Sequence, residues 1–455
     1  MKSLVFANVD ENSVIRVTKE KSIKTYPPKI STIDSLNLFE AIMEKIIDKP
    51  KVFQKYGFNL LPVIYEDLYW YYCFHYVKYE NFFKDFNSSR IVFKSKYDWQ
   101  LNSVERKNRF FSGDTFYMIL KLFLKRLIFI IWLLSNIVLK KKNKTWVSSS
   151  IVNDFRYNFF SSLNKTEILI ILNRWTTVRS SLRTSRNIDD AITNNIHKKV
   201  GSVGLWCLAI RLLRPNKIIC QDNLFDNYSL LLAAKINNIE VIGISHGLAS
   251  FWHRGITGSK HFNKCKDLIK YDRYYCWLPE MKKMLDDNSF IYSKDEILVS
   301  GWLKDYPVAK KRNSEPISKF VLYPYEWLCN HDLIKLYLFE LNKLGYKIII
   351  KMRPDKENYD HLNGLNAEFI DNFSSFHFEN ASFAIGSTTT IIYEFSFNKL
   401  PVFLIMNDGF DMFKEIDLKC WIKINDLNDL RKKINYRNNI KQPIISKNFI
   451  MEFRK

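Results

Sequence analysis

Short β-branched runs alternate with helical patterns along most of this 455-residue chain, and this alternation constrains the fold more than any other feature. In the first half, the runs expected to form strands are 146–152, 166–172, 217–220, 240–245, 271–277 and 297–302. Helical patterns separate the later runs, at 203–213 and 227–237. Strands and helices that alternate at this spacing form right-handed βαβ units around a parallel sheet. The sequence therefore predicts an α/β protein.

A second series of the same kind follows a segment without periodicity. Residues 304–318 are charged and contain two prolines, as is typical of a boundary between domains. Beyond it, the expected strand segments are 320–325, 346–354, 367–370, 381–390, 400–406 and 420–424, and the expected helices are 331–344, 389–398 and 426–434. We therefore expect two doubly wound domains, one over residues 1–305 and one over 306–440.

The cysteines and the charge restrict the compartment and the partners. The seven cysteines are scattered, without a Cys-x-x-Cys pair or a Cys/His cluster, so we expect neither a zinc site nor a disulfide framework. This pattern and the lack of a signal-peptide core at the N-terminus favour a cytoplasmic protein. The formal net charge of +22 attracts polyanions, but no interleaved Arg/aromatic motif points to a nucleic-acid partner.

Residues 116–144 combine apolar side chains with seven cations and no acid. The purely apolar centre, 127–134, is far shorter than the ~20 residues of a membrane span. A helical wheel places polar residues on one side and apolar residues on the other: Lys121, Lys125, Ser135 and Asn136 against Leu127, Ile130, Leu133, Leu134, Ile137 and Val138. We expect an interfacial helix on an anionic membrane surface. A buried core helix and a true span are the alternatives.

An aromatic stripe lies upstream of this segment. Tyr and Phe recur between residues 65 and 86 with alternating spacings of four and three residues, which aligns them on one face of a helix. A core-facing or dimer-facing stripe is the first interpretation. A stacking platform for the sugar rings of an acceptor is the second, because aromatic faces stack on apolar sugar faces.

The stretch VIGISHGLAS, at 241–250, carries a candidate functional residue. Its β-branched start indicates a buried strand, and the strand ends at Ser245-His246-Gly247. In open α/β sheets, ligands bind at the carboxyl ends of the strands. His246 is therefore a candidate for contacting a ligand, and a residue that only caps the turn is the alternative.

A hydroxyl-rich turn is the strongest motif of the second half. A strand is expected to end at Gly386, and Ser387, Thr388, Thr389 and Thr390 follow it at the start of a helix. Hydroxyls and free backbone N–H groups there would form an anion cradle at the positive end of the helix dipole. Glu394, one to two turns further on, could accept hydrogen bonds from ribose hydroxyls. An ordinary helix N-cap is the alternative.

Charged residues follow other strands. Lys351 and Arg353 end the strand at 346–354 and suit a phosphate or pyrophosphate, and Tyr323 and Tyr325 are expected to face the same crevice. In the first half, Asp222 follows the strand at 217–220, and Asp154 follows the one at 146–152. Carboxylates at such positions can serve as a catalytic base or nucleophile in transfer to a hydroxyl. A helix-capping role for Asp222 is the alternative.

The motifs SHG, SGWLKDY, KMRP and GSTTTIIYEFSFNKLPV together resemble GT-B glycosyltransferases that build bacterial surface polysaccharides. More narrowly, they are similar to the capsule and lipopolysaccharide families that use CMP-activated keto-acid sugars such as Kdo, and to the related CDP-glycerol glycerophosphotransferases. The resemblance covers about 217–405. Two residues depart from the pattern: Ser245 replaces the usual glutamine before His-Gly, and Arg353 replaces the histidine of a His-Pro pair that contacts donor phosphate.

The resemblance implies an α/β GT-B fold in which two Rossmann-like domains face a central cleft. The C-terminal domain would hold the nucleotide sugar through Lys351, Arg353, Ser387, Thr388, Thr389 and Glu394. The N-terminal domain would hold a lipid-linked or polysaccharide acceptor, and the tail at 441–455 would cross back to it. No metal and no cofactor are expected, because basic groups and helix dipoles neutralise the leaving phosphate.

The expected function is thus transfer of a sugar, such as a Kdo-type sugar carried on CMP, to a lipopolysaccharide or capsule acceptor. We expect this transfer at the inner face of the cytoplasmic membrane. The expected catalytic residues are Asp222, His246 and Asp154. A CDP-polyol phosphotransferase of the same fold is the first alternative. A non-catalytic module that binds anionic lipid or nucleic acid is the second.

Overall fold

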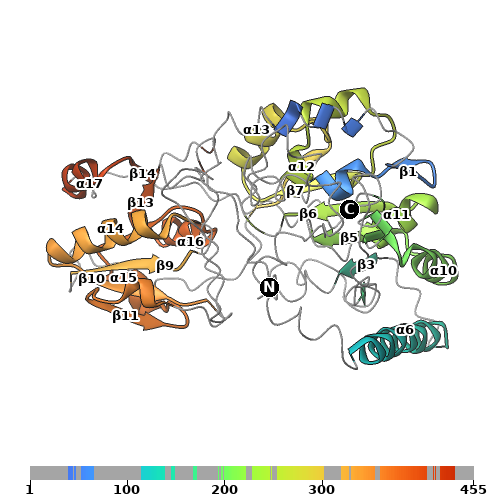
Figure 1. Cartoon of the computed structure of the whole chain (residues 1–455), viewed down its shortest axis with the longest axis horizontal. Coiled ribbons are helices and arrows are strands. Elements are labelled where there is room, and N and C mark those ends of the chain that lie inside the picture. The colour runs from blue at the N-terminus through green and yellow to red at the C-terminus, as the bar shows by residue number, and fades with distance from the viewer. Residues whose placement is uncertain are drawn as a thin grey trace, which may run out of the picture. The chain divides into compact units, whose positions relative to one another are not determined.

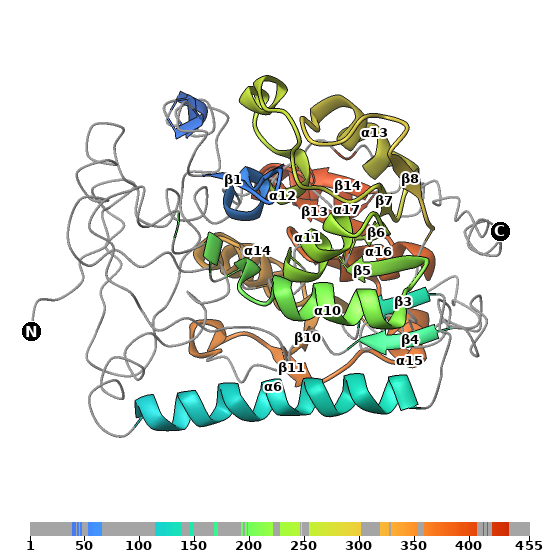
Figure 2. The ribbon, with the colours of Figure 1, turned by 90° about the vertical axis from the view of Figure 1, so that its right-hand side faces the viewer.

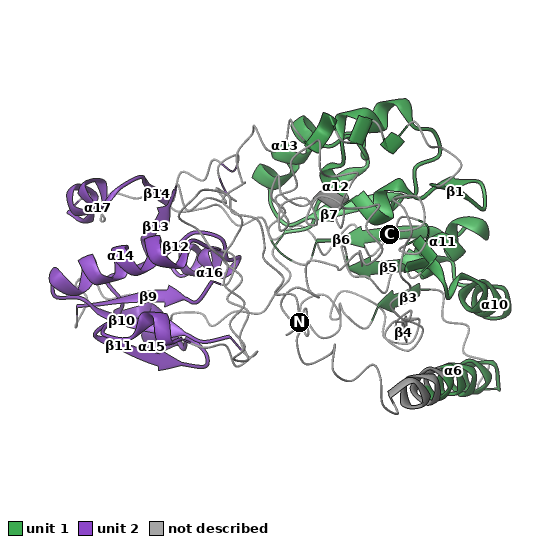
Figure 3. Cartoon of the chain, viewed as in Figure 1, with its two compact units in different colours: residues 1–25, 33–304, 448–455 green, residues 26–32, 305–447 purple. Residues whose placement is uncertain are grey.

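A computed structural model describes most of the two predicted sheets and their helices. The described residues fall in 39–65, 114–138, 145–148, 168–171, 193–221, 228–247, 254–301, 319–353, 359–406, 413, 416 and 421–435, with gaps at 42, 45, 48–52, 194, 195, 198, 246, 248–253, 327 and 328. The chain divides into two compact units (Figure 3). Unit 1 comprises residues 1–25, 33–304 and 448–455, and unit 2 comprises 26–32 and 305–447.

Unit 1 is built on a six-stranded parallel sheet. Its strands are β3 (Thr145–Ser148), β4 (Ile168–Ile171), β5 (Lys217–Gln221), β6 (Glu240–Ile244), β7 (Arg273–Cys276) and β8 (Ile297–Val299). They are arranged in the order β4-β3-β5-β6-β7-β8. The strand order therefore reverses between β3 and β5, which makes the carboxyl ends of these two strands the ligand-binding point of a sheet of this type.

Helices and a small hairpin complete the described part of unit 1 (Figure 1). They are β1 (Gln54–Lys55), β2 (Phe58–Asn59), α6 (Asp114–Val138), α10 (Val203–Leu213), α11 (Tyr228–Ile236), α12 (Arg254–Thr257), η3 (Lys260–Lys264) and α13 (Pro279–Asn288). Aromatic rings join α6 to the sheet layer: the Phe129 and Trp206 centroids are 5.0 Å apart, and those of Trp132 and Trp146 are 6.3 Å apart. Trp146 lies on β3 and Trp206 on α10, so α6 is attached to both elements.

Unit 2 contains a second six-stranded parallel sheet. Its strands are β9 (Phe320–Pro324), β10 (Lys347–Lys351), β11 (Ala367–Ile370), β12 (Phe383–Gly386), β13 (Val402–Ile405) and β14 (Trp421–Ile424). Their order, β11-β10-β9-β12-β13-β14, is the order 3-2-1-4-5-6 of a dinucleotide-binding Rossmann sheet. Here the reversal lies between β9 and β12.

The helices of unit 2 are α14 (His331–Lys343), η4 (Asp360–Leu362), α15 (Ser375–Asn380), α16 (Ile391–Phe397) and α17 (Leu427–Ile434). Helix α14 begins at an Asn330 cap, whose side chain accepts a hydrogen bond from the backbone N–H of Leu333 at 3.1 Å. Its apolar face packs on the sheet in a core that includes Ile334, Leu338 and Leu341. These sheets confirm the predicted fold class, α/β with two Rossmann-like doubly wound domains, the kind of domain from which a GT-B fold is built.

The N-terminal predictions are tested in part. The apolar spacing at 34–48 predicts a helix, and within it Phe39, Met43 and Ile46 are helical and buried. Tyr65, the first residue of the aromatic stripe, is fully buried and donates a hydrogen bond to the buried Glu40 carboxylate at 2.7 Å. The rest of the stripe and the tail 441–455 lie outside the described residues, as do the segments 3–7 and 90–93, whose sequences predict strands.

Candidate functional site

The candidate site lies where the strand order of unit 2 reverses. Strands β9 and β12 are parallel neighbours there, and β10 flanks β9 on its other side. The chain leaves β9 through Tyr325 and Glu326, and it leaves β12 through Ser387. The carboxyl ends of these strands thus lie at one edge of the sheet, in the position where Rossmann-type sheets bind nucleotides.

A carboxylate of the chain itself occupies the hydroxyl-rich turn. The backbone N–H of Ser387 donates to both Glu326 oxygens at 2.9 Å, and the Ser387 hydroxyl donates to Oε2 at 3.0 Å. The backbone N–H groups of Thr388 and Thr389 donate to Oε1 at 2.7 and 2.9 Å. Glu326 is only 2% exposed. We call this set of hydrogen bonds the Glu326 clamp.

The clamp corrects one expectation about the turn. The backbone N–H groups of Ser387, Thr388 and Thr389 were expected to be free for a bound anion, but they are paired with Glu326. The physical reason is that donors at the start of a helix attract the nearest carboxylate, and a buried carboxylate needs several donors. Sequence reasoning missed Glu326 because an acid two residues after a strand is indistinguishable from an ordinary loop residue.

Gly386 makes the clamp possible. A Cβ at this position would lie 3.2 Å from Glu326 Oε1 and 3.0 Å from Cδ1 of Ile392. Both distances are tighter than ordinary van der Waals contact. The glycine before the turn therefore leaves room for the chain's own carboxylate and for the first turn of α16.

The hydroxyl groups of two threonines in the turn are not used by the clamp. The side chains of Thr388 and Thr389 are half-buried, and neither hydroxyl is bonded to Glu326. Thr389 Oγ1 accepts a long hydrogen bond, 3.5 Å, from the backbone N–H of Ile391. Glu394, also half-buried, lies in the first turn of α16. The surface of the turn thus presents hydroxyl oxygens and a carboxylate.

Two cations end the neighbouring strand. Lys351 is the last residue of β10, and Arg353 lies two residues beyond it; both are half-buried. The Tyr325 backbone N–H donates to the Lys351 carbonyl at 3.0 Å, and the Arg353 backbone N–H donates to the Tyr359 hydroxyl at 2.9 Å. Since Tyr325 precedes Glu326, the basic strand end and the hydroxyl-rich turn are joined through two consecutive residues.

The aromatic residues at the end of β9 are buried. Tyr323 and Tyr325 were both expected to face the crevice, but they are 1% and 7% exposed and belong to the hydrophobic core. Tyr325 contacts the rings of Tyr359, His331 and His361, at centroid distances of 4.7, 5.6 and 5.7 Å. Burial raises the pKa of the Tyr323 phenol well above the ordinary value. The alternation of side chains along β9 places Tyr323 on the face covered by α14.

The catalytic residues predicted in the first half, Asp154, Asp222 and His246, lie outside the described residues. Residues next to Asp222 and His246 in the sequence are described, and they form hydrogen bonds. Gln221, which precedes Asp222, is buried at the end of β5, and its carbonyl accepts a 3.4 Å hydrogen bond from the Tyr271 hydroxyl. Ser245 is also buried, and its hydroxyl donates to the Gly247 carbonyl at 2.5 Å, across His246.

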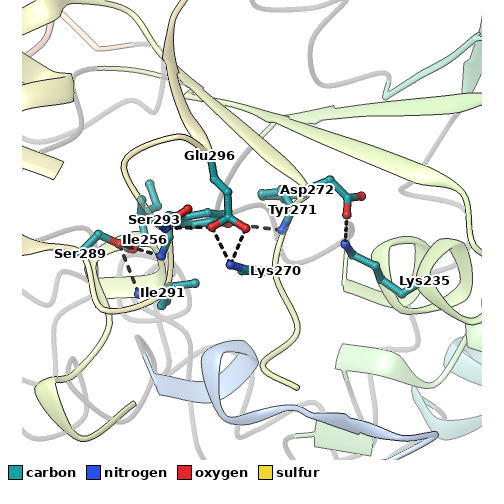
Figure 4. Close-up of polar contacts among 10 residues, drawn as sticks. Lys235, Ile256, Lys270, Tyr271, Asp272, Ser289, Ile291, Ser293 and Glu296 are labelled. Atoms are coloured by element: carbon teal, nitrogen blue, oxygen red, sulfur yellow. Dashed lines mark hydrogen bonds and ion pairs between the residues drawn. The ribbon is translucent and has the colours of Figure 1, made fainter. Parts of the chain in front are cut away.

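Charged groups gather at the amino ends of strands in the first sheet, opposite its ligand-binding edge (Figure 4). Asp272, just before β7, accepts hydrogen bonds from Lys235 at 2.5 Å and from the Val241 backbone N–H at 2.8 Å. The Lys270 ammonium bonds both Glu296 oxygens, at 2.7 and 2.6 Å. These groups precede strands rather than follow them. Their role is to fix the starts of β6 and β7, away from the ligand-binding edge.

No set of three or more His, Cys, Asp or Glu side chains in the described part of the chain is arranged to hold a metal ion.

No protein-family model matches the chain, and no curated protein matches it in sequence. Several solved structures are similar in fold. UDP-GlcNAc 2-epimerase of Methanocaldococcus jannaschii, in complex with UDP-GlcNAc and UDP, is 11% identical; the match covers 68% of this chain and 97% of that one, with a TM-score of 0.41. A putative UDP-N-acetylglucosamine 2-epimerase of Listeria monocytogenes is 10% identical over 68% and 94% of the two chains, with a TM-score of 0.42.

The calicheamicin glycosyltransferase CalG4 is 11% identical, over 68% of this chain and 85% of its own, with a TM-score of 0.39. Similarity of this degree does not identify the activity of the present chain, which has to be inferred from its own residues.

Proposed function

We propose that this protein is a GT-B glycosyltransferase that uses a nucleotide-activated sugar and binds its donor at the carboxyl edge of the second sheet. The observation that carries the proposal is the convergence at the β9–β12 reversal: Lys351 and Arg353 end β10, Thr388 and Thr389 follow β12, and the Tyr325–Glu326 segment joins them. A sheet of order 3-2-1-4-5-6 binds nucleotides at this point.

The Glu326 clamp determines how a donor phosphate would be held. Because Glu326 takes the backbone donors of the turn and the Ser387 hydroxyl, the phosphate oxygens would be bound by other side chains, namely the Lys351 ammonium, the Arg353 guanidinium and the hydroxyls of Thr388 or Thr389. Arg353 can bind phosphate through two parallel N–H groups. Glu394 would accept hydrogen bonds from ribose hydroxyls.

The remaining predicted residues belong to unit 1 and would take part in the proposed chemistry. A carboxylate, Asp222 or Asp154, would take the proton of the acceptor hydroxyl, and His246 would contact the donor. The leaving nucleotide phosphate would be neutralised by Lys351 and Arg353 without a metal ion. We propose a CMP-linked keto-acid sugar of the Kdo type as donor and a lipopolysaccharide or capsule glycan as acceptor.

The first test is nucleotide-dependent stabilisation of the full chain. A donor at one hundred times its dissociation constant should stabilise the folded protein by about 2.7 kcal/mol, which a thermal-shift panel of CMP-, CDP- and UDP-linked donors would detect. Stabilisation by a CMP-sugar alone supports the proposal as stated. A preference for CDP-glycerol would favour a polyol-phosphate transferase, and a UDP-sugar preference would overturn the CMP assignment.

Strand β10 offers a matched control. Lys351→Gln should abolish the donor-induced shift, whereas Lys347→Gln at the other end of the same strand should leave it unchanged, because Lys347 pairs with Glu368 at 2.7 Å. Equal shifts in both variants would exclude the proposed phosphate site. If no nucleotide stabilises the protein, while vesicles or duplex bind it in a salt-dependent manner, the protein is a binding module rather than a transferase.

A second test concerns catalysis. Asp222→Asn should lower the transfer rate by at least about a hundredfold while the donor-induced shift persists. His246→Ala should lower the rate by a similar factor and also reduce the shift, because it removes a proposed contact with the donor. Full rates in both variants would show that these role assignments are wrong.

A further inference from the structure

Helix α6 has one face attached to unit 1. Phe129, Leu133 and Asn136 are 1%, 4% and 7% exposed. Phe129 and Trp132 contact the Trp206 ring at centroid distances of 5.0 and 6.5 Å, and the Asn136 amide donates to the Trp132 carbonyl at 2.7 Å. The inner face of the helix is therefore fixed to unit 1 by ring contacts, and the polar group of its buried asparagine is satisfied within the helix.

The opposite face is apolar and exposed. Among its residues, Phe123 is 61%, Ile131 57%, Leu134 55% and Val138 78% exposed. The full set of exposed large apolar residues on α6 is Phe123, Leu124, Leu127, Ile128, Ile130, Ile131, Leu134, Ile137 and Val138. We call it the outer face of α6. In Figures 1 and 2 the other described elements of the unit lie to one side of this helix.

This arrangement refines the helical wheel derived from the sequence. Leu133 was expected on the exposed apolar side and Asn136 on the opposite, polar side, but both are buried with Phe129 on the inner face. Phe123, Leu124, Ile128 and Ile131 are exposed in addition to the predicted residues. A buried core helix is excluded, because a core helix would not expose nine large apolar side chains.

The charged residues from 115 to 144 in the sequence have one sign. Arg126 is exposed on α6, and Lys140, Lys141, Lys142 and Lys144 follow the helix in sequence. No Asp or Glu occurs from residue 115 to residue 153. None of the helices in the described part of the chain is long and apolar enough to cross a bilayer. An apolar face with adjacent cations suits the interface of a membrane that carries anionic lipids.

We propose that α6 binds the surface of an anionic membrane, with its axis in the membrane plane and its outer face in the region between headgroups and acyl chains. The inner face remains on unit 1, so that no rearrangement of the unit is needed. A second copy of the chain is less suitable as the occupant, because the cations of each helix, Lys121, Lys125 and Arg126, outnumber its one acid, Asp114. The proposal does not depend on the proposed enzymatic function.

Vesicle co-sedimentation of the full chain tests the proposal. The wild-type protein should sediment with phosphatidylcholine vesicles that contain about one third phosphatidylglycerol, and much less with pure phosphatidylcholine vesicles or at high salt. The double variant Leu127→Asp/Ile131→Asp should reduce partitioning at least about tenfold, because two apolar side chains would no longer enter the interface.

Leu336→Asp is the matched control. Leu336 lies on α14 of unit 2 and is 56% exposed, close to the 57% of Ile131, so that its replacement introduces one of the two charges of the double variant at similar exposure. This variant should bind vesicles like the wild type. Circular dichroism and thermal unfolding of all three proteins show whether the double variant is folded.

Three results would overturn the proposal. The first is equal vesicle binding by the wild type and a folded Leu127→Asp/Ile131→Asp variant, and the second is no binding by the wild type. The third is a wild-type dimer at micromolar concentration that the double variant, but not Leu336→Asp, converts to a monomer, because the outer face would then be a self-association surface. Donor-induced stabilisation, measured on the same variants, reports separately on the proposed enzymatic site.

Discussion

Glu326 Oε1 lies 2.7 Å from the backbone nitrogen of Thr388 and 2.9 Å from that of Thr389. The N-terminal turn of α16 is therefore closed by an anion that belongs to the chain. Any phosphate bound near this turn has to approach a site whose backbone donors are already paired, so charge complementarity must come from Lys351, Arg353 and the threonine hydroxyls.

Glu326→Gln should destabilise unit 2. The amide has one oxygen in place of two, and its NH₂ group would face backbone N–H donors, so buried donors would lose their partners. Removing a charged hydrogen-bond partner at a buried position costs about 2–4 kcal/mol. Hydrogen-exchange mass spectrometry should show faster exchange in the peptide that contains residues 387–389. Glu368→Gln is the control, since its carboxylate is 49% exposed and forms a surface pair with Lys347. Unchanged protection in Glu326→Gln would contradict the clamp.

Two glycines of unit 1 should respond to alanine in opposite directions. A Cβ at Gly243 on β6 would overlap the ring of Tyr271, whereas a Cβ at Gly204 in α10 would have no atom within 4 Å. We expect Gly243→Ala to destabilise the protein by about 1–3 kcal/mol through overpacking. Gly204→Ala should stabilise it by about 0.5–1 kcal/mol, because alanine has the higher helix propensity.

The urea midpoints of the two glycine variants measure this difference. A shift of the same sign in both would show that the packing of Tyr271 on β6 is not as described.

The Lys270–Glu296 pair should contribute to acid sensitivity. Burial raises the pKa of Glu296, but hydrogen bonds from Lys270 and Ser293 and the Lys270 charge outweigh it, so that the pKa lies below the ordinary value of 4.5. A carboxyl group with a depressed folded-state pKa stabilises the fold above its unfolded pKa, and this contribution is lost as the pH falls through the folded value.

Glu296→Gln should therefore lower the urea midpoint near about pH 6, and this effect should shrink as the pH falls below the ordinary pKa of 4.5 and through the lowered folded-state pKa. Asp287→Asn on α13 is a control outside this ion pair. A constant difference between Glu296→Gln and wild type at all pH values would contradict the assignment.

Phe129→Ala should loosen α6 from its unit. Phe129 is 1% exposed and contacts the Trp206 ring at 5.0 Å, and removal of a buried phenyl group costs about 3–5 kcal/mol. Tryptophan emission should shift to longer wavelength as the cluster of Trp132, Trp146 and Trp206 becomes hydrated. Phe123→Ala, at a position that is 61% exposed, should leave the emission unchanged and weaken only vesicle binding.

Much of the sheet architecture was predictable because parallel strands buried on both faces have a simple sequence pattern. KIIC, EVIGI and KIIIK are nearly continuous β-branched runs, and each forms a strand. Helix α10 begins and ends where its apolar periodicity does, at Val203 and Leu213. The short α12 and α15 were not predicted, since four and six residues are too few to show a helical period.

The site was less predictable because its key contact is distant in sequence. The hydroxyl-rich turn indicated an anion at its start, and an anion is present, but it is the side chain of Glu326, 61 residues before Ser387. Only the pairing of β9 with β12 brings the two together. Likewise, periodicity placed Leu133 on the exposed apolar face, whereas Leu133 is buried on the same face of α6 as Phe129, which contacts Trp206 of α10.

The clamp also has a consequence for the order of folding. Its two ends belong to neighbouring strands of the sheet that are separated by the whole β10–β11 segment, so it can form only after that long loop has closed. Strands β9, β10 and β11 can pair before this event, with Glu326 still hydrated. The carboxylate then loses its water at the moment when β12 docks, which links completion of the sheet to the ordering of the turn that follows it.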